Sequence, residues 1–270
     1  MRALLMLAFA SFASFASAAV VDGVQIHSTT HGSGSKTVIF VHGWTCDESS
    51  WAEQVPAFEK NYRVITMDLP GHGKSGAPKD AALSMALFAR AIEAVRAEAK
   101  ADKVVLVGHS MGVPVIRQYA RMFPAHVVGL VPVDGVLHLS GSPSAPNPAQ
   151  MQGAQGLKNR EVMIRGMFGK GATPAIQEHV LKMMLGAPES TATQAMAAMF
   201  VTSNWTEEVM PFLVLGIYAD KSTANDPAYM KKIFPNSSVT EVAGTGHFVM
   251  LEKPAEFNKL LSDFLAKAKF

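Results

Sequence analysis

The sequence predicts an α/β fold, built on a doubly wound and mostly parallel sheet with an inserted helical cap. Short, nearly continuous apolar runs alternate with longer segments of helical periodicity, and turn residues follow each run. Strands buried on both faces of a parallel sheet have this pattern, and strand–helix alternation favours a doubly wound arrangement. The expected strands span residues 36–41, 62–67, 103–107, 127–133, 212–218 and 238–242.

Helical periodicity appears at residues 84–100, 111–122 and 254–267, and Ser84 is the expected N-cap of the first of these helices. The segment from residue 136 to residue 208 breaks the alternation. Residues 139–156 have the composition of a loop, and residues 160–205 are helical in pattern with no clear strand. We therefore expect a helical cap at 136–208, inserted into a core formed by residues 19–135 and 209–270. The cap is rich in methionine, which indicates either an adaptable apolar pocket or ordinary helix packing.

The composition excludes several classes of protein. Hydrophobic residues make up 49% of the 270-residue chain and charged residues 17%, which favours one large core over disorder. The formal net charge is +2, and the basic residues are scattered, so we expect no nucleic-acid partner. Cys46 is the single cysteine, which rules out an intramolecular disulfide and a cysteine-based zinc site.

The first eighteen residues are typical of a signal peptide. Arg2 gives a positive start, residues 3–15 carry no charge, and Ala16, Ser17 and Ala18 are the small residues that a signal peptidase requires. The apolar stretch is shorter than the roughly 20 residues that span a membrane. We expect cleavage after Ala18, export to the periplasm or the medium, and no stable membrane span afterwards.

The strongest chemical signal is the segment Gly108-His109-Ser110-Met111-Gly112, which lies between an expected strand and an expected helix. It matches the G-x-S-x-G nucleophile elbow, in which a sharp turn exposes the serine hydroxyl. Glycines two residues to either side remove Cβ atoms that would clash in such a turn. The backbone N–H of Met111, at the helix start, is then free to bind a developing oxyanion.

Four motifs follow one another along the chain: Phe40-Val41-His42-Gly43-Trp44, Asp68-Leu69-Pro70-Gly71-His72-Gly73-Lys74-Ser75, the serine elbow and Gly246-His247-Phe248. In this order they resemble the α/β-hydrolase superfamily, in its serine esterase and lipase-like branch, over residues 24–135 and 210–268. The residue after the elbow is Val113, where many relatives have a further glycine.

The position of His247 makes it the expected general base. It lies between a strand end and the last helix, and the chain order of serine, acid and histidine fits this fold. The resemblance implies that Asp220 is the acid of the triad, with Asp134 as the competing candidate. It also implies that the backbone N–H of Trp44 is the second oxyanion donor. His72 and His109 belong to turn motifs, so neither is the expected base, and His42 is expected to be structural and to bond the local backbone.

These features predict a carboxylesterase-like serine hydrolase that cleaves a small carboxylic ester through an acyl-enzyme intermediate. No metal or organic cofactor is expected. The same triad also serves lactones, thioesters, carbon–carbon bonds or cofactor-free perhydrolysis, and a non-catalytic ligand-binding protein on the same fold is a further alternative. The methionine-rich cap suggests an apolar acyl or alcohol group on the substrate.

Overall fold

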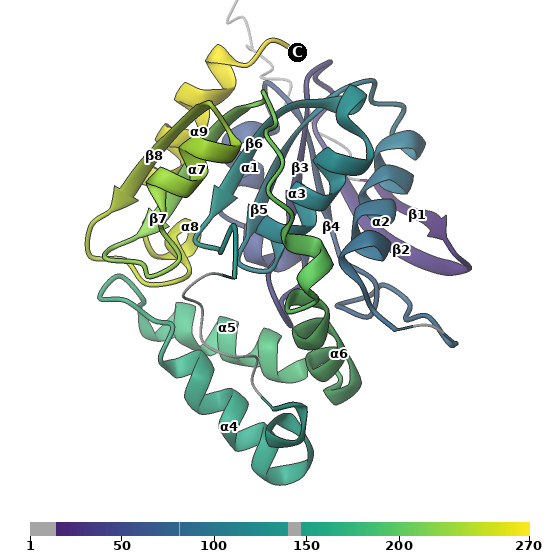
Figure 1. Ribbon diagram of the computed structural model, residues 1–270, viewed down its shortest axis with the longest axis vertical. Helices are drawn as coiled ribbons and strands as arrows, with labels where there is room; N and C mark the ends of the chain where they lie inside the picture. The colour runs from purple at the N-terminus through teal and green to yellow at the C-terminus, as the bar shows by residue number, and fades with distance from the viewer. Residues whose placement is uncertain (1–14, 81, 140–146) are drawn as a thin grey trace, which may run out of the picture.

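The computed structural model describes residues 15–80, 82–139 and 147–270. Its centre is an eight-stranded sheet in the order β1-β2-β4-β3-β5-β6-β7-β8 (Figure 1). β1 and β2 run antiparallel to their neighbours, and the other strands are parallel, as the sequence predicts. The strands are β1 (Phe15–Val21), β2 (Val24–His31), β3 (Thr37–Val41), β4 (Arg63–Met67), β5 (Val104–His109), β6 (Val127–Val133), β7 (Leu213–Ala219) and β8 (Asn236–Val242).

Helices flank this sheet and form a separate group beyond one end of it (Figure 1). The N-cap prediction for α2 is confirmed, because the Ser84 side chain accepts a hydrogen bond from the backbone N–H of Leu87 at 3.1 Å. The helices are α1 (Val55–Phe58), α2 (Met85–Glu98), α3 (Gly112–Met122), α4 (Gly153–Arg165), α5 (Pro174–Gly186), α6 (Glu189–Met199), α7 (Pro227–Ile233), α8 (Val249–Glu252) and α9 (Pro254–Lys267). No helix in the described ranges is long and apolar enough to span a membrane.

The strand order brings three loops to one edge of the sheet. β5 lies between β3 and β6, with Val41 paired to Gly108 and His109 paired to Val133. Since the strands are parallel, the segments that follow β3, β5 and β6 all emerge at the same edge, where ligands bind in open α/β sheets. These segments begin at His42, Ser110 and Asp134.

All regular elements described between β6 and β7 are helical, including α4, α5 and α6. In Figure 1 these three helices lie together below the edge where β5 and β6 end. The methionines in and around these helices pack into or against the hydrophobic core, which supports the packing interpretation of this composition. They are Met151, Met163, Met167, Met183, Met184, Met196, Met199 and Met210. The boundaries at 136 and 208 stay a prediction.

The two antiparallel strands at the sheet edge were not predicted. β2 alternates buried and more exposed residues, as a strand with one covered face does, so it lacks a continuous apolar run. β1 includes residues 15–18 of the expected signal peptide, and residues 1–14 lie outside the described part. Cleavage after Ala18 would leave the end of the strand, where Ala19 pairs with Ile26 and Val21 with Val24.

Candidate active site

Ser110 occupies a sharp turn between β5 and α3. Its φ of 54° lies in the left-handed region, which is uncommon for a residue with a side chain. The two flanking glycines make this turn possible. A Cβ on Gly108 would lie 2.4 Å from the carbonyl oxygen of Gly112, and one on Gly112 would lie 2.5 Å from the carbonyl oxygen of Val41. The local geometry is therefore that of a nucleophile elbow.

His247 lies against this elbow, in the loop between β8 and α8. Its ring centroid is 4.7 Å from that of His109, the residue directly before Ser110. The backbone carbonyl of His247 accepts a hydrogen bond of 2.8 Å from Nε2 of His109. Burial and the nearby His247 lower the pKa of His109 to about 3, so its ring is neutral at neutral pH. His109 thus acts as a support for the His247 loop, and this role was not predicted.

The structure pairs His247 with Asp134. Nδ1 of His247 donates to Oδ2 of Asp134 at 2.6 Å, and the other carboxylate oxygen accepts from the backbone N–H of Ala219 at 3.0 Å. Burial alone would raise the pKa of Asp134, but the hydrogen bond and the charge of His247 lower it below its ordinary value. Asp134 is therefore ionised at neutral pH and fixes the proton of a neutral His247 on Nδ1, which leaves Nε2 with a free lone pair.

Asp220, the acid favoured from the sequence, is not the partner of His247. It lies exposed after β7, and its Oδ2 accepts a hydrogen bond of 3.0 Å from the backbone N–H of Gly244. The reason is topological, because Asp134 follows β6, the direct neighbour of the serine strand, while Asp220 follows the next strand outward. Asp134 was the competing candidate, and the geometry favours it.

The turn after β3 packs directly on the elbow. A Cβ on Gly43 would lie 2.9 Å from Cβ of Ser110, so only glycine allows this approach. His42 holds the turn from inside, since Nδ1 donates to the carbonyl of Gly43 at 2.8 Å and Nε2 accepts from the N–H of Leu69 at 2.9 Å. His42 is thus a structural residue, as expected.

The two expected oxyanion donors are the backbone N–H groups of Met111, the residue after Ser110, and of Trp44, the residue after Gly43. Trp44 and Met111 are both buried, and their N–H groups donate to no backbone carbonyl among the turn and loop hydrogen bonds of the described residues. The indole of Trp44 donates to the carbonyl of Ala192 in α6 at 2.8 Å, which ties this turn to the helical segment. The two amides remain candidates for binding a negatively charged oxygen.

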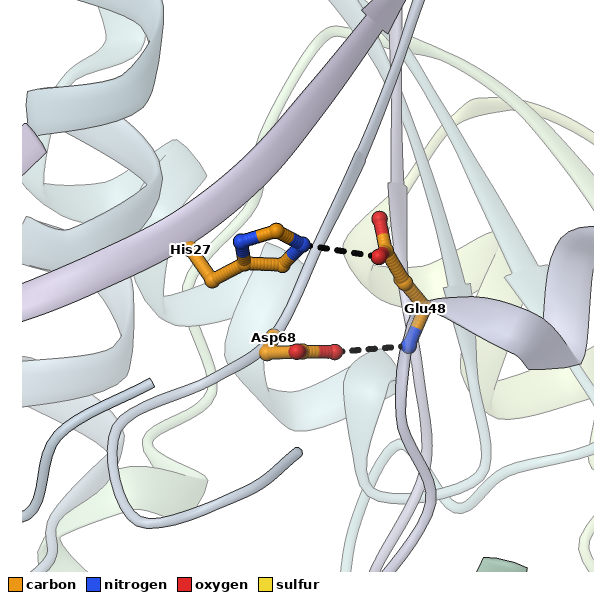
Figure 2. Close-up of side chains that lie close together, drawn as sticks. All are labelled: His27, Glu48 and Asp68. Atoms are coloured by element: carbon orange, nitrogen blue, oxygen red, sulfur yellow. Dashed lines mark hydrogen bonds and ion pairs between the residues drawn. The ribbon is translucent and has the colours of Figure 1, made fainter. Parts of the chain in front are cut away.

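His27, Glu48 and Asp68 form the group whose composition most resembles a metal site (Figure 2). Their ligand atoms lie within 4.8 Å of one another. However, Nζ of Lys74 lies 2.9 Å from Oε1 of Glu48 and 3.4 Å from Nε2 of His27. Both oxygens of Asp68 accept backbone N–H groups, from Glu48 and Lys74. An ammonium group already offsets the charge of Glu48, and backbone N–H groups already occupy both oxygens of Asp68, so this group fits a metal poorly.

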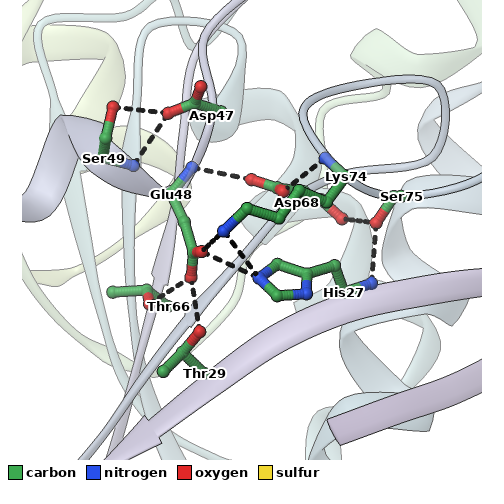
Figure 3. Close-up of polar contacts among 9 residues, drawn as sticks. All are labelled: His27, Thr29, Asp47, Glu48, Ser49, Thr66, Asp68, Lys74 and Ser75. Atoms are coloured by element: carbon green, nitrogen blue, oxygen red, sulfur yellow. Dashed lines mark hydrogen bonds and ion pairs between the residues drawn. The ribbon is translucent and has the colours of Figure 1, made fainter. Parts of the chain in front are cut away.

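Figure 3 shows instead a hydrogen-bond network that joins β2, β4 and the loop carrying Glu48. Burial alone would raise the pKa of Glu48, but four side-chain donors outweigh it and lower the pKa to about 2. The donors are Lys74, Thr29, His27 and Thr66. The network fixes the loop that follows Trp44, and its stability depends on an ionised Glu48.

Acid should therefore weaken this network. A carboxylate whose pKa is lowered by folding stabilises the native state above its unfolded pKa, and this contribution is lost as the pH falls through the folded pKa. We expect Glu48→Gln to lower the free energy of unfolding near pH 7, and this difference from wild type to shrink between pH 4.5 and about 2. Urea denaturation across this range tests it, with Glu53→Gln on the exposed surface as the control. A difference that stays constant with pH would contradict the expectation.

A pocket of about 550 Å³ lies between α5 and the segment at residues 45–49. Its lining is mixed, with Asp47, Lys182 and His179 beside Met183. Cys46 also lines it, and burial raises the pKa of this thiol to about 12, so the residue is a protonated, buried side chain. The pocket gives no support for a purely apolar substrate group, which stays a prediction.

Comparison with known proteins identifies the family of this chain. Residues 38–260 match the alpha/beta hydrolase family. This chain therefore belongs to the alpha/beta hydrolase family, and the expected fold class is confirmed.

Its relatives differ in the reactions their names describe. It is 26% identical to a dihydrolipoyllysine-residue acetyltransferase component of an acetoin cleaving system from Cupriavidus necator, over 92% of this chain and 68% of the relative. It is 27% identical to an (E)-2-((N-methylformamido)methylene)succinate hydrolase from Acinetobacter baylyi, over 88% of this chain and 93% of the relative. A thermophilic esterase from Thermogutta terrifontis has the same fold, with a TM-score of 0.82, 20% identity, and coverage of 94% of this chain and 98% of that one.

Proposed function

We propose that this protein is a serine hydrolase that cleaves a small carboxylic ester, with Ser110 as nucleophile, His247 as general base and Asp134 as the acid of the triad. One observation carries the proposal. A histidine bonded to a buried carboxylate at 2.6 Å packs against His109, the residue directly before a serine whose φ of 54° is that of a nucleophile elbow. In this arrangement Asp134 orients the imidazole and holds its proton on Nδ1, so Nε2 can accept a proton, and the turn exposes the serine hydroxyl.

The reaction proceeds in two halves. Nε2 of His247 takes the proton of the Ser110 hydroxyl as Oγ attacks the ester carbonyl carbon. The backbone N–H groups of Trp44 and Met111 bind the oxyanion that forms. The intermediate collapses when the alcohol leaves with the proton held by His247. Water, deprotonated by His247, then attacks the acyl-enzyme and releases the carboxylic acid and Ser110. Asp134 stabilises the imidazolium in both halves.

The catalytic groups alone do not define the substrate class. The names of the relatives describe hydrolysis in one case and acetyl transfer in another, and both reactions are compatible with an acyl-enzyme. Lactones, thioesters, carbon–carbon bonds and cofactor-free perhydrolysis use the same groups. A ligand-binding protein without turnover is the alternative of a different class. The intact pairing of His247 with Asp134 favours an enzyme, because binding alone does not require it.

A panel of p-nitrophenyl esters of graded acyl length, together with lactones, tests this function. We expect turnover of short esters, with a burst of p-nitrophenol equal to the enzyme concentration if deacylation is the slower half. Turnover of lactones without turnover of esters would change the proposed substrate class to lactones and leave the proposed mechanism unchanged. Tight binding of an ester analogue with no turnover of any substrate would contradict the enzyme and favour the binding protein.

We also propose that the protein is exported, with cleavage after Ala18. The support is the composition of residues 1–18. Ala19 and Val21, which are buried in the sheet, would remain in the mature chain. N-terminal sequencing of protein recovered from a periplasmic extract tests the proposal, and a mature chain that still begins before Ala19 would contradict the cleavage site.

A further inference from the structure

The loop that carries His247 touches the helical segment between β6 and β7. The backbone N–H of His247 donates to the carbonyl of Met167 at 2.8 Å. Met167 lies in the turn between α4 and α5, about eighty residues earlier in the chain (Figure 1). The rings of Phe168 in this turn and Phe248 in the loop also pack together, with centroids 6.2 Å apart. The α4–α5 turn therefore packs directly against the loop that carries the general base.

Glu252, at the end of α8, bridges the two segments. Its Oε2 accepts from the backbone N–H of Gly246 at 2.9 Å, and its Oε1 accepts from the backbone N–H of Gly169 at 3.1 Å. The side chain is buried, with 7% of its surface exposed. Each carboxylate oxygen thus binds one segment, and one of the two amides belongs to the residue directly before His247.

Gly169 and Gly246 allow the two segments that Glu252 joins to approach each other closely. A Cβ on Gly169 would lie 2.0 Å from the backbone nitrogen of Gly246, and a Cβ on Gly246 would lie 2.2 Å from the backbone nitrogen of Gly169. The two amides therefore lie side by side with no side chain between them. A carboxylate can satisfy both at once, with one oxygen for each amide.

We propose that Glu252 is a positioning residue, which fastens the His247 loop to the α4–α5 turn and so sets the place of the imidazole relative to Ser110. The inference rests on the proposed function of His247. With Glu252 in place, four contacts fix the base: Asp134 at the ring, His109 at the carbonyl, Met167 at the N–H, and Glu252 through Gly246. The helical segment is then part of the machinery that positions the base.

Glu252→Gln tests this role with little change in shape. The amide keeps one acceptor oxygen, but its NH₂ group faces the second backbone N–H, so either Gly246 or Gly169 loses its partner. We expect kcat for a p-nitrophenyl ester to fall about 10- to 100-fold, because a small displacement of a catalytic group has effects of this size. KM should change little, since no contact with the substrate is removed. Glu256→Gln, the same change on an exposed residue of α9, should leave kcat unchanged.

Two further measurements separate positioning from stability. Thermal unfolding shows whether Glu252→Gln is folded at the assay temperature. Gly169→Ala forces the same two backbones apart, and it carries the test if Glu252→Gln fails to fold. If both changes act on one contact, their effects on kcat should combine to much less than the product of the single effects. A wild type without any esterase or lactonase activity would refute the proposed function. An active wild type, with a folded Glu252→Gln variant at the kcat of the Glu256→Gln control, would refute the positioning role alone.

Discussion

Replacing Ser110 by alanine is expected to lower kcat for an ester by about four to six orders of magnitude, while the fold is retained. The side chain supplies the only oxygen at the elbow that can form the acyl-enzyme, and its Cβ is kept in alanine. The strained φ of 54° is retained too, so the glycine contacts around it are unaffected. Steady-state kinetics with a p-nitrophenyl ester and circular dichroism of the same preparation check this expectation.

The matched control is Ser262→Ala, which makes the same chemical change on the exposed side of α9. It should hydrolyse the ester at the wild-type rate. If purified Ser110→Ala protein retained ester hydrolysis within a factor of ten of wild type, another group would have to be the nucleophile, and the elbow would have a purely structural meaning.

Replacing Asp134 by asparagine should have the second largest effect, a loss of about four orders of magnitude in kcat. The asparagine oxygen can keep the hydrogen bond from the N–H of Ala219, which turns the NH₂ group toward Nδ1 of His247. Nδ1 must then accept, so the ring proton moves to Nε2 and the histidine can no longer take a proton from Ser110. The imidazolium also loses the buried negative charge that stabilises it.

Asp220→Asn is the paired measurement, because the sequence favoured this residue. Its carboxylate is exposed and contacts the backbone N–H of Gly244, so we expect a change in kcat of less than about threefold. A large loss from Asp220→Asn together with a small loss from Asp134→Asn would reverse the assignment. Such a result would require the β7–β8 loops to rearrange in solution, so that Asp220 reaches His247.

The choice between these two acids illustrates what the sequence could not decide. Both follow buried strands and both precede His247, so chain order and turn composition treat them alike. What separates them is which strand lies next to β5 and how the His247 loop crosses the sheet edge. Both features belong to the tertiary structure, and no local sequence pattern indicates them. The serine elbow was predictable because glycine spacing is itself a steric consequence of the turn.

Other parts of the chain also divide into features that a local sequence pattern predicts and features that only the tertiary structure shows. The parallel strands were predictable from continuous apolar runs. β2 was missed because a strand with one covered face alternates instead, and β1 was missed because part of it falls within the expected signal peptide. Glu252 follows His247 by five residues, and no pattern shows that its carboxylate turns back toward Gly246. His109 was set aside as part of a turn motif, and that is correct for its neutral ring, but its support of the His247 carbonyl requires the folded structure.

Covalent labelling with a fluorophosphonate, followed by mass spectrometry of the peptides, tests directly whether Ser110 is the activated nucleophile. We expect one adduct per chain, located on Ser110, absent from Ser110→Ala, and formed far more slowly in Asp134→Asn than in Asp220→Asn. An adduct on a different residue, or no adduct on a preparation that hydrolyses esters, would contradict this expectation.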